Sequence, residues 1–201
     1  QYKNISPTLS SSVNIIVKSS QKPLFNVPEM NFGNMPADGG TLILSEHEKN
    51  EILSKDEKYF EFIRPLVSAK ELLKGQNKWC FWLKGYSFEK LMEYPVLKER
   101  IIKNKEIRLD SSRPKLAEIP HLFGQITQPE DEDFILVPRV SSENRNYIPL
   151  TRYEKNYISN DTCLVIGSND LSLMAQLSSK AHMVWMRNCA GRLKNDYRYS
   201  A

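Results

Sequence analysis

The residues best suited to specific chemistry lie together near the C-terminal end of the sequence. Residues 190–200, AGRLKNDYRYS, place three cations, an acid, an amide and two tyrosines directly after an expected helix end at Gly191. Arginine or lysine can donate to N7 and O6 of guanine, aspartate can accept from the N4 amine of cytosine, and tyrosine or arginine can hold phosphate. A solvated helix end with tyrosines packed underneath has the same composition, so these residues alone favour neither interpretation.

The charge distribution points to the same part of the chain. The net charge of +4 and the isoelectric point near 8.9 are compatible with a polyanionic partner, but many proteins without one share them. Residues 139–198 hold nine Lys or Arg against five acids, a surplus equal to that of the whole chain. The nine are Arg139, Arg145, Arg152, Lys155, Lys180, Arg187, Arg192, Lys194 and Arg198.

Motifs of catalytic chemistry are missing from the sequence. It has no glycine-rich phosphate loop, no methyltransferase tetrapeptide built around Pro-Pro, no HExxH and no nucleophile elbow. The three histidines, His47, His121 and His182, are far apart, and each is expected on a helix surface or in a core rather than on a metal. The sequence therefore predicts no catalytic residue, no metal site and no enzymatic activity for this segment.

Length and cysteine content bound the class of protein. With 201 residues, of which 40% are hydrophobic and 26% charged, the chain is expected to fold as one domain, or as one domain with a small subdomain. Its three cysteines are widely spaced without a CxxC pair or a secretory leader, which favours the cytoplasm. No apolar run approaches the roughly 20 residues of a membrane span, so no membrane contact is expected. The start at Gln1 and the stop within a motif indicate a segment of a longer parent chain.

Strands and helices are expected to alternate without a regular βαβ rhythm. Strands are predicted at residues 13–17, 41–44, 78–83, 134–140 and 162–166, and an ordered loop at residues 19–40. Capping-box spacing at Ser45 and Ser68 marks two helix starts, the second helix ending at Gly75. Longer helices are predicted over residues 87–105, bent at Pro95, and over residues 170–190. The fold class is α+β, and Trp79, Trp82 and Trp185 are expected to be structural.

Six spaced motifs carry a resemblance to a known family. They are NMPADGG at residues 34–40, FIRP at 62–65, KWCFWL at 78–83, VPRVSSE at 137–143, HMVW at 182–185 and GRL through YRYS at 191–200. Together they resemble the target recognition domain of MmeI-like type II restriction-modification enzymes. The resemblance implies a recognition domain over residues 31–201, preceded by a connecting segment over residues 1–30.

The resemblance also implies partners and cofactors. In that family one polypeptide joins an endonuclease, an adenine-N6 methyltransferase using S-adenosylmethionine, and the recognition domain. Double-stranded DNA and the other domains are then the expected partners. S-adenosylmethionine and a divalent metal are expected in the parent chain, and no cofactor in this segment.

The family's base-reading positions fall on six residues of this sequence. Lys194 and Asp196 form one pair, expected to face the same side of an extended backbone and to read G on one strand and C on the other. Arg139 and Asp161 form a second pair expected on one G·C pair, while Thr162 and Arg198 match positions that read a neighbouring base. The candidates for DNA backbone contacts are Arg145, Arg187 and Arg192. The alternatives are a nucleic-acid or protein-interaction module without base specificity and, less favoured, a standalone enzyme.

Overall fold

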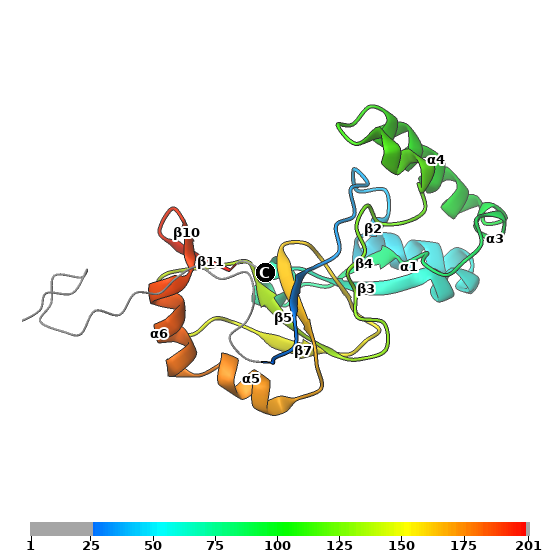
Figure 1. Ribbon diagram of the computed structural model, residues 1–201. Helices are drawn as coiled ribbons and strands as arrows, with labels where there is room; N and C mark the ends of the chain where they lie inside the picture. The colour runs from blue at the N-terminus through cyan, green and yellow to red at the C-terminus, as the bar shows by residue number, and fades with distance from the viewer. Residues whose placement is uncertain (1–25, 200–201) are drawn as a thin grey trace, which may run out of the picture.

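The computed structural model describes residues 26–199 and shows three small sheets with helices at both ends of an elongated molecule (Figure 1). One lobe holds a sheet of order β2-β4-β3-β8, and the other holds a sheet of order β1-β9-β5-β7 together with a small sheet of order β10-β11-β6. The predicted α+β class is confirmed. The strand expected at residues 13–17 lies outside the described residues.

The first lobe contains β2 (Ile43–Leu44), β3 (Ile63–Val67), β4 (Lys78–Phe81) and β8 (Ile158–Ser159). Its α-helices are α1 (Glu46–Lys55), α2 (Ala69–Lys74), α3 (Phe88–Met92) and α4 (Pro95–Leu109). Two 3-10 helices, η1 (Glu57–Phe62) and η2 (Pro114–Glu118), complete it.

The capping signals of the sequence are confirmed in this lobe. Ser45 and Glu48 form a capping box at the start of α1, and Ser68 and Glu71 form one at the start of α2. Gly75 ends α2 with a φ of 63°, a left-handed conformation that glycine adopts without strain.

The helix predicted over residues 87–105 is wrong in one respect. Pro95 does not bend a single helix but begins α4, and two residues separate it from the end of α3. At the first helical position a proline costs no hydrogen bond, because that N–H has no partner within the helix.

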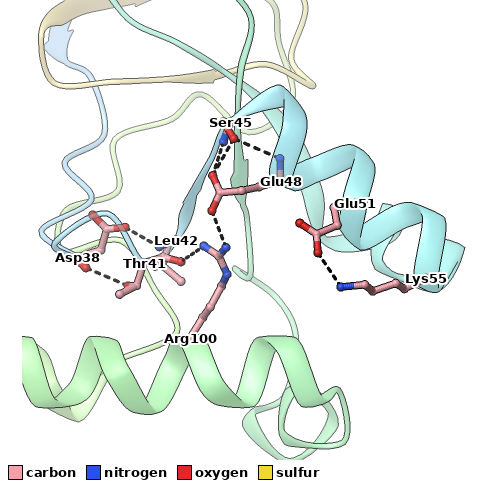
Figure 2. Close-up of polar contacts among 8 residues, drawn as sticks. All are labelled: Asp38, Thr41, Leu42, Ser45, Glu48, Glu51, Lys55 and Arg100. Carbon is pink, nitrogen blue, oxygen red and sulfur yellow. Dashed lines mark hydrogen bonds and ion pairs between the residues drawn. The ribbon is translucent and has the colours of Figure 1, made fainter.

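Polar contacts tie α4 to the start of α1. The guanidinium of Arg100 donates to the backbone oxygen of Thr41 at 2.8 Å and to Glu48 at 2.9 Å, as Figure 2 shows. Glu48 also accepts from the backbone N–H of Ser45 at 2.9 Å. The backbone N–H of Ser45 and the Arg100 guanidinium together lower the pKa of the Glu48 carboxyl to about 2.

The second lobe is built on a sheet that is covered on both faces. Its strands are β1 (Met30–Phe32), β9 (Cys163–Gly167), β5 (Phe134–Pro138) and β7 (Thr151–Tyr153). Alternate residues of β5 and β9 pack into two different hydrophobic clusters, one beneath α5 and α6 and one against the start of α2. All five residues of β5 are therefore buried.

Two further expectations in this lobe need correction. Residues 30–32 are not part of a loop, because β1 pairs antiparallel with β9. The helix expected over residues 170–190 is two helices, α5 (Leu171–Leu177) and α6 (Lys180–Cys189). Ser179 separates them, since its hydroxyl caps α6 by accepting from the backbone N–H of His182 at 3.1 Å.

The small sheet lies beside α6 at one end of the molecule (Figure 1). It consists of β6 (Val140–Ser141), β10 (Gly191–Leu193) and β11 (Asp196–Arg198), paired antiparallel. Residues 190–200 were expected to form a loop after the helix, and most of them instead form this hairpin. It is anchored to α6 by a hydrogen bond between Tyr199 and His182, and burial lowers the pKa of the His182 imidazole.

Candidate nucleic-acid interface

Lys194 and Asp196 lie in a tight turn and the strand that follows it. Lys194 occupies the turn between β10 and β11 with a φ of 55°, and Asp196 is the first residue of β11. The expectation of an extended backbone across both residues is therefore wrong. The hairpin still carries both side chains at its tip, with Lys194 exposed and Asp196 half-buried.

The strand register sorts the hairpin side chains onto two faces. Residues paired across antiparallel strands share a face, and neighbours along a strand alternate. Leu193 pairs with Asp196, and Arg198 pairs with Val140, so these side chains share one face. The opposite face carries Arg192, Tyr197 and Ser141.

Arg192 is used within the hairpin itself. Its guanidinium lies over the Tyr197 ring, 4.0 Å from the ring centre, and donates to the backbone oxygen of Asn195 at 2.9 Å. These contacts hold the turn that presents Lys194. Arg192, a candidate for a phosphate contact, therefore already uses some of its donors within the hairpin.

Asp196 joins the hairpin to the segment after β6. Its Oδ1 accepts from the backbone N–H of Glu143 at 3.2 Å. A carboxylate has further acceptor capacity on its second oxygen, so this contact orients the group without saturating it.

Arg139 and Asp161 are close to each other but do not form an ion pair. Nη1 of Arg139 donates to the backbone oxygen of Asp161 at 3.0 Å, and its guanidinium lies 4.7 Å from the centre of the Phe32 ring. Within residues 26–199, the carboxylate of Asp161 takes part in no salt bridge. The ordinary ion pair that was the alternative explanation for these two residues is therefore absent from this part of the chain.

A buried asparagine fixes the turn that carries Asp161 and Thr162. Asn34 is fully buried and accepts from the backbone N–H groups of Thr127 at 2.8 Å and Gln128 at 3.0 Å. Its Nδ2 donates to the backbone oxygen of Ser159 at 2.9 Å. The preceding Gly33 leaves no room for a side chain, because a Cβ there would overlap the backbone oxygen of Asn160.

Three of the six predicted base-reading residues line a common hollow. Arg139, Thr162 and Arg198 surround it together with three apolar residues, Ala69, Val140 and Leu193. Thr162 is held there because its hydroxyl accepts from the backbone N–H of Ala69 at 3.2 Å. Asp161, Lys194 and Asp196 do not line this hollow. The three apolar residues were missed, since no sequence signal separates them from ordinary core positions.

The basic candidates of this region form no ion pairs among the described residues. In the described part of the chain, ion pairs hold Lys49, Lys55, Lys84, Lys90 and Arg100 of the first lobe, and Arg152 of the second. The cations without an ion pair there include every basic candidate: Arg139, Arg145, Arg187, Arg192, Lys194 and Arg198. Their charge is not neutralised by neighbouring acids and is available to a polyanion.

The helix that precedes the hairpin, α6, carries further cations. Arg187 is exposed there and, with Lys180 from the same helix and Tyr147, lines a second hollow. Arg145 is half-buried in the loop that leads to Tyr147.

The expectation that all three tryptophans are structural is wrong for one of them. Trp79 and Trp82 pack against the core of the first lobe. Trp185 on α6 keeps 52% of its surface exposed. The helical spacing that predicted its burial counted both sides of α6, and only Met183 and Met186 of this helix are buried.

Residues 26–199 contain no group of three His, Cys, Asp or Glu arranged to hold a metal ion. No helix among them is both long and apolar enough to pass through a bilayer.

Comparison with known proteins identifies the class. The family described as "MmeI, target recognition domain" matches residues 11–201. "DNA methyltransferase A" of Bacillus subtilis (strain 168) is 37% identical over 98% of this chain and 23% of its own length. A solved structure of the type IIL restriction-modification enzyme MmeI in complex with DNA superimposes with a TM-score of 0.89 at 37% identity, covering 99% of this chain and 27% of that one.

The chain belongs to the MmeI target recognition domain family. It spans about a quarter of the length of the two relatives.

Proposed function

We propose that this chain reads the base sequence of double-stranded DNA for a longer DNA methyltransferase. The observation that carries the proposal is the surface formed by Arg139, Thr162, Arg198 and the β10–β11 hairpin, whose cations have no ion pair among the described residues. Family membership supports it, and the MmeI enzyme of the same family has been solved in complex with DNA.

In this proposal two residue pairs each read one G·C base pair. The free donors of the Arg139 guanidinium reach guanine, and the unpaired carboxylate of Asp161 accepts from the partner cytosine. At the hairpin tip, Lys194 donates to N7 and O6 of a guanine while Asp196 accepts from the cytosine opposite. Thr162 and Arg198, at the common hollow, contact a neighbouring base pair.

Backbone contacts would fix the register of the domain on the duplex. Arg187 is exposed on α6 and is suited to a phosphate contact. It lines one hollow together with Tyr147, and Arg145 precedes Tyr147 by two residues in the same loop. Arg192 adds positive charge near the hairpin, although its guanidinium also supports the turn.

The parent chain would supply the chemistry. We place adenine-N6 methylation with S-adenosylmethionine, and cleavage with a divalent metal, in other domains of the same polypeptide. The described residues offer no metal-binding group, so no step of that chemistry is assigned to them. The described cysteines are free thiols, which suits a cytoplasmic location.

The proposal is tested by exchanging the charges at the hairpin tip. In the full-length protein, Lys194→Glu with Asp196→Arg should favour C where G was required, because donor and acceptor exchange places against the base pair. Sequencing the sites methylated by this variant measures the effect. A matched control exchanges Glu51 and Lys55, an exposed ion pair on α1, and should leave the recognition sequence unchanged.

An active charge-exchange variant that methylates the original sequence would contradict the assignment of Lys194 and Asp196. A salt titration with cognate and scrambled duplexes tests the broader proposal. A base reader keeps a preference for the cognate duplex as salt rises, whereas a general nucleic-acid module binds both equally.

A further inference from the structure

The hollow between Arg139 and Arg198 has an apolar floor that the proposed base contacts do not use. It is formed by segments far apart in the sequence: the first residue of α2, the end of β5 with β6, the start of β9 and the β10–β11 hairpin. Ala69, Val140 and Leu193 line it, and no acidic residue does.

Leu193 is not explained by packing of the fold. Its side chain is 51% exposed, and it belongs to none of the hydrophobic clusters of the described residues. The strand register places it on the same face as Val140 and Arg198, two other residues of the hollow. A large, half-exposed apolar side chain thus lines the same hollow as Arg139 and Arg198.

The position of the hollow restricts what can fill it. Two arginines that form no ion pair among residues 26–199 line it and favour a polyanion, and its apolar lining favours a small apolar group on that polyanion. Unmodified double-stranded DNA has one such group in its major groove, the 5-methyl of thymine, which apolar side chains contact. Cytosine presents hydrogen at that position and an amine beside it.

We infer that this hollow takes the edge of a thymine, with its 5-methyl group against Leu193 and Val140. The inference rests on the proposed function and adds one base preference to it. A methyl group buried against Leu193 contributes to affinity about as much as one buried methylene, equivalent to roughly fourfold in binding. The neighbouring guanidinium groups remain free for guanine or phosphate.

The experiment removes the methyl group from the DNA and the leucine from the protein. In the full-length protein's recognition sequence, each thymine is replaced in turn by deoxyuridine, which differs only by the methyl group. Wild-type protein should bind one of these duplexes about fourfold more weakly than the unmodified duplex. Leu193→Ala should show a clearly smaller difference between that duplex and the unmodified one.

Control variants separate this role from general effects. Leu109→Ala removes an equally exposed leucine at the end of α4 and should keep the full deoxyuridine penalty. Val140→Ala provides a second variant of the hollow should Leu193→Ala fail to fold, and it should reduce the penalty as well.

Three results would overturn the inference: no thymine with a penalty, a penalty unchanged in the folded hollow variants, or a recognition sequence containing only G·C pairs. Each is distinguishable from failure of the proposed function. If wild-type protein discriminates cognate from scrambled DNA, the domain reads bases, whatever the deoxyuridine series gives.

Discussion

At the level of single residues, a buried arginine outside the basic surface connects several separate turns. Arg108 is 1% exposed, and burial lowers the pKa of its guanidinium. It donates to five backbone oxygens, those of Pro36, Ala37, Leu116, Ile119 and Leu122. One side chain thus ties the segment before β2 and the turns after α4 to a single point.

We predict that Arg108→Lys destabilises the protein by at least about 2 kcal/mol, although the charge is kept. An ammonium has three donors on one nitrogen and cannot serve five carbonyls spread around a guanidinium, so buried acceptors stay unpaired. Urea denaturation measures the loss. Arg113→Lys, an exposed change nearby, should have almost no effect, and equal stabilities of the two variants would contradict the assignment.

Glu48 is expected to make the stability of the protein depend on pH. The Ser45 backbone N–H and Arg100 stabilise the charged form of its carboxyl. Its folded pKa of about 2 lies below the ordinary 4.5, so its stabilising effect is complete above about pH 4.5 and lost as the pH falls toward 2. Glu48→Gln should cost about 1 kcal/mol or less at pH 7, since the group is partly exposed.

Denaturation curves collected from pH 7 to pH 2 check this expectation. The difference between wild type and Glu48→Gln should shrink to nothing at the acid end. Glu51→Gln, which removes only an exposed contact to Lys55, should show a smaller difference at neutral pH. A wild-type advantage that is independent of pH would rule out this account.

Among helices and strands, the sequence predicted most accurately the features that depend only on neighbouring residues. Capping boxes at Ser45 and Ser68 depend on residues three positions apart, and both are present. The break between α5 and α6 at Ser179 also depends on neighbouring residues. This break was not predicted from the sequence, because apolar residues continue at helical spacing on both sides of Ser179. Strand β1 was missed for a different reason: its three residues gain their conformation from pairing with β9, more than 130 positions later.

The hairpin shows the same limit within the candidate site. Gly191 and the polar residues after it are typical of a loop following a helix, and the strand pairing of β11 with β6 depends on residues about 57 positions apart. The residue types of the base-reading candidates were available from the sequence. The grouping of three of them, Arg139, Thr162 and Arg198, around one hollow with the apolar residues Val140 and Leu193 came only from the structure.

An element-scale prediction follows from the contact between β1 and the turn before β9. Gly33→Ala should destabilise the protein by about 1–3 kcal/mol, because the added Cβ overlaps the rigid backbone of Asn160 and displaces the turn carrying Asp161 and Thr162. Thermal denaturation and the recognition sequence report the two consequences. At Gly191, whose nearest neighbour to an added Cβ lies at 3.7 Å, the same change should be tolerated, and equal tolerance at Gly33 would disprove the close contact.

At the scale of the whole molecule, charges are arranged differently in the two lobes. Residues 26–133, which hold most of the first lobe, contain 16 Lys or Arg against 19 acids, and four of these cations form ion pairs along α1, α3 and α4. The second lobe leaves its cations around the hairpin and α6 unpaired within the described residues. This asymmetry gives the proposed DNA surface its sign, and it depends on where the acids lie rather than on the modest net charge.

We predict that the cations on α6 contribute to the salt dependence of DNA binding. Lys180→Ala with Arg187→Ala should weaken cognate and scrambled DNA binding by the same factor and lower the slope of log affinity against log salt by about 2, because two phosphate contacts are lost. The double variant Lys103→Ala with Lys105→Ala removes the same charge from exposed positions on α4 and should leave the slope almost unchanged. Fluorescence anisotropy at several salt concentrations, with full-length proteins, gives both slopes. Equal slopes for the two variants would mean that net charge alone governs binding and that the outer face of α6 does not contact DNA.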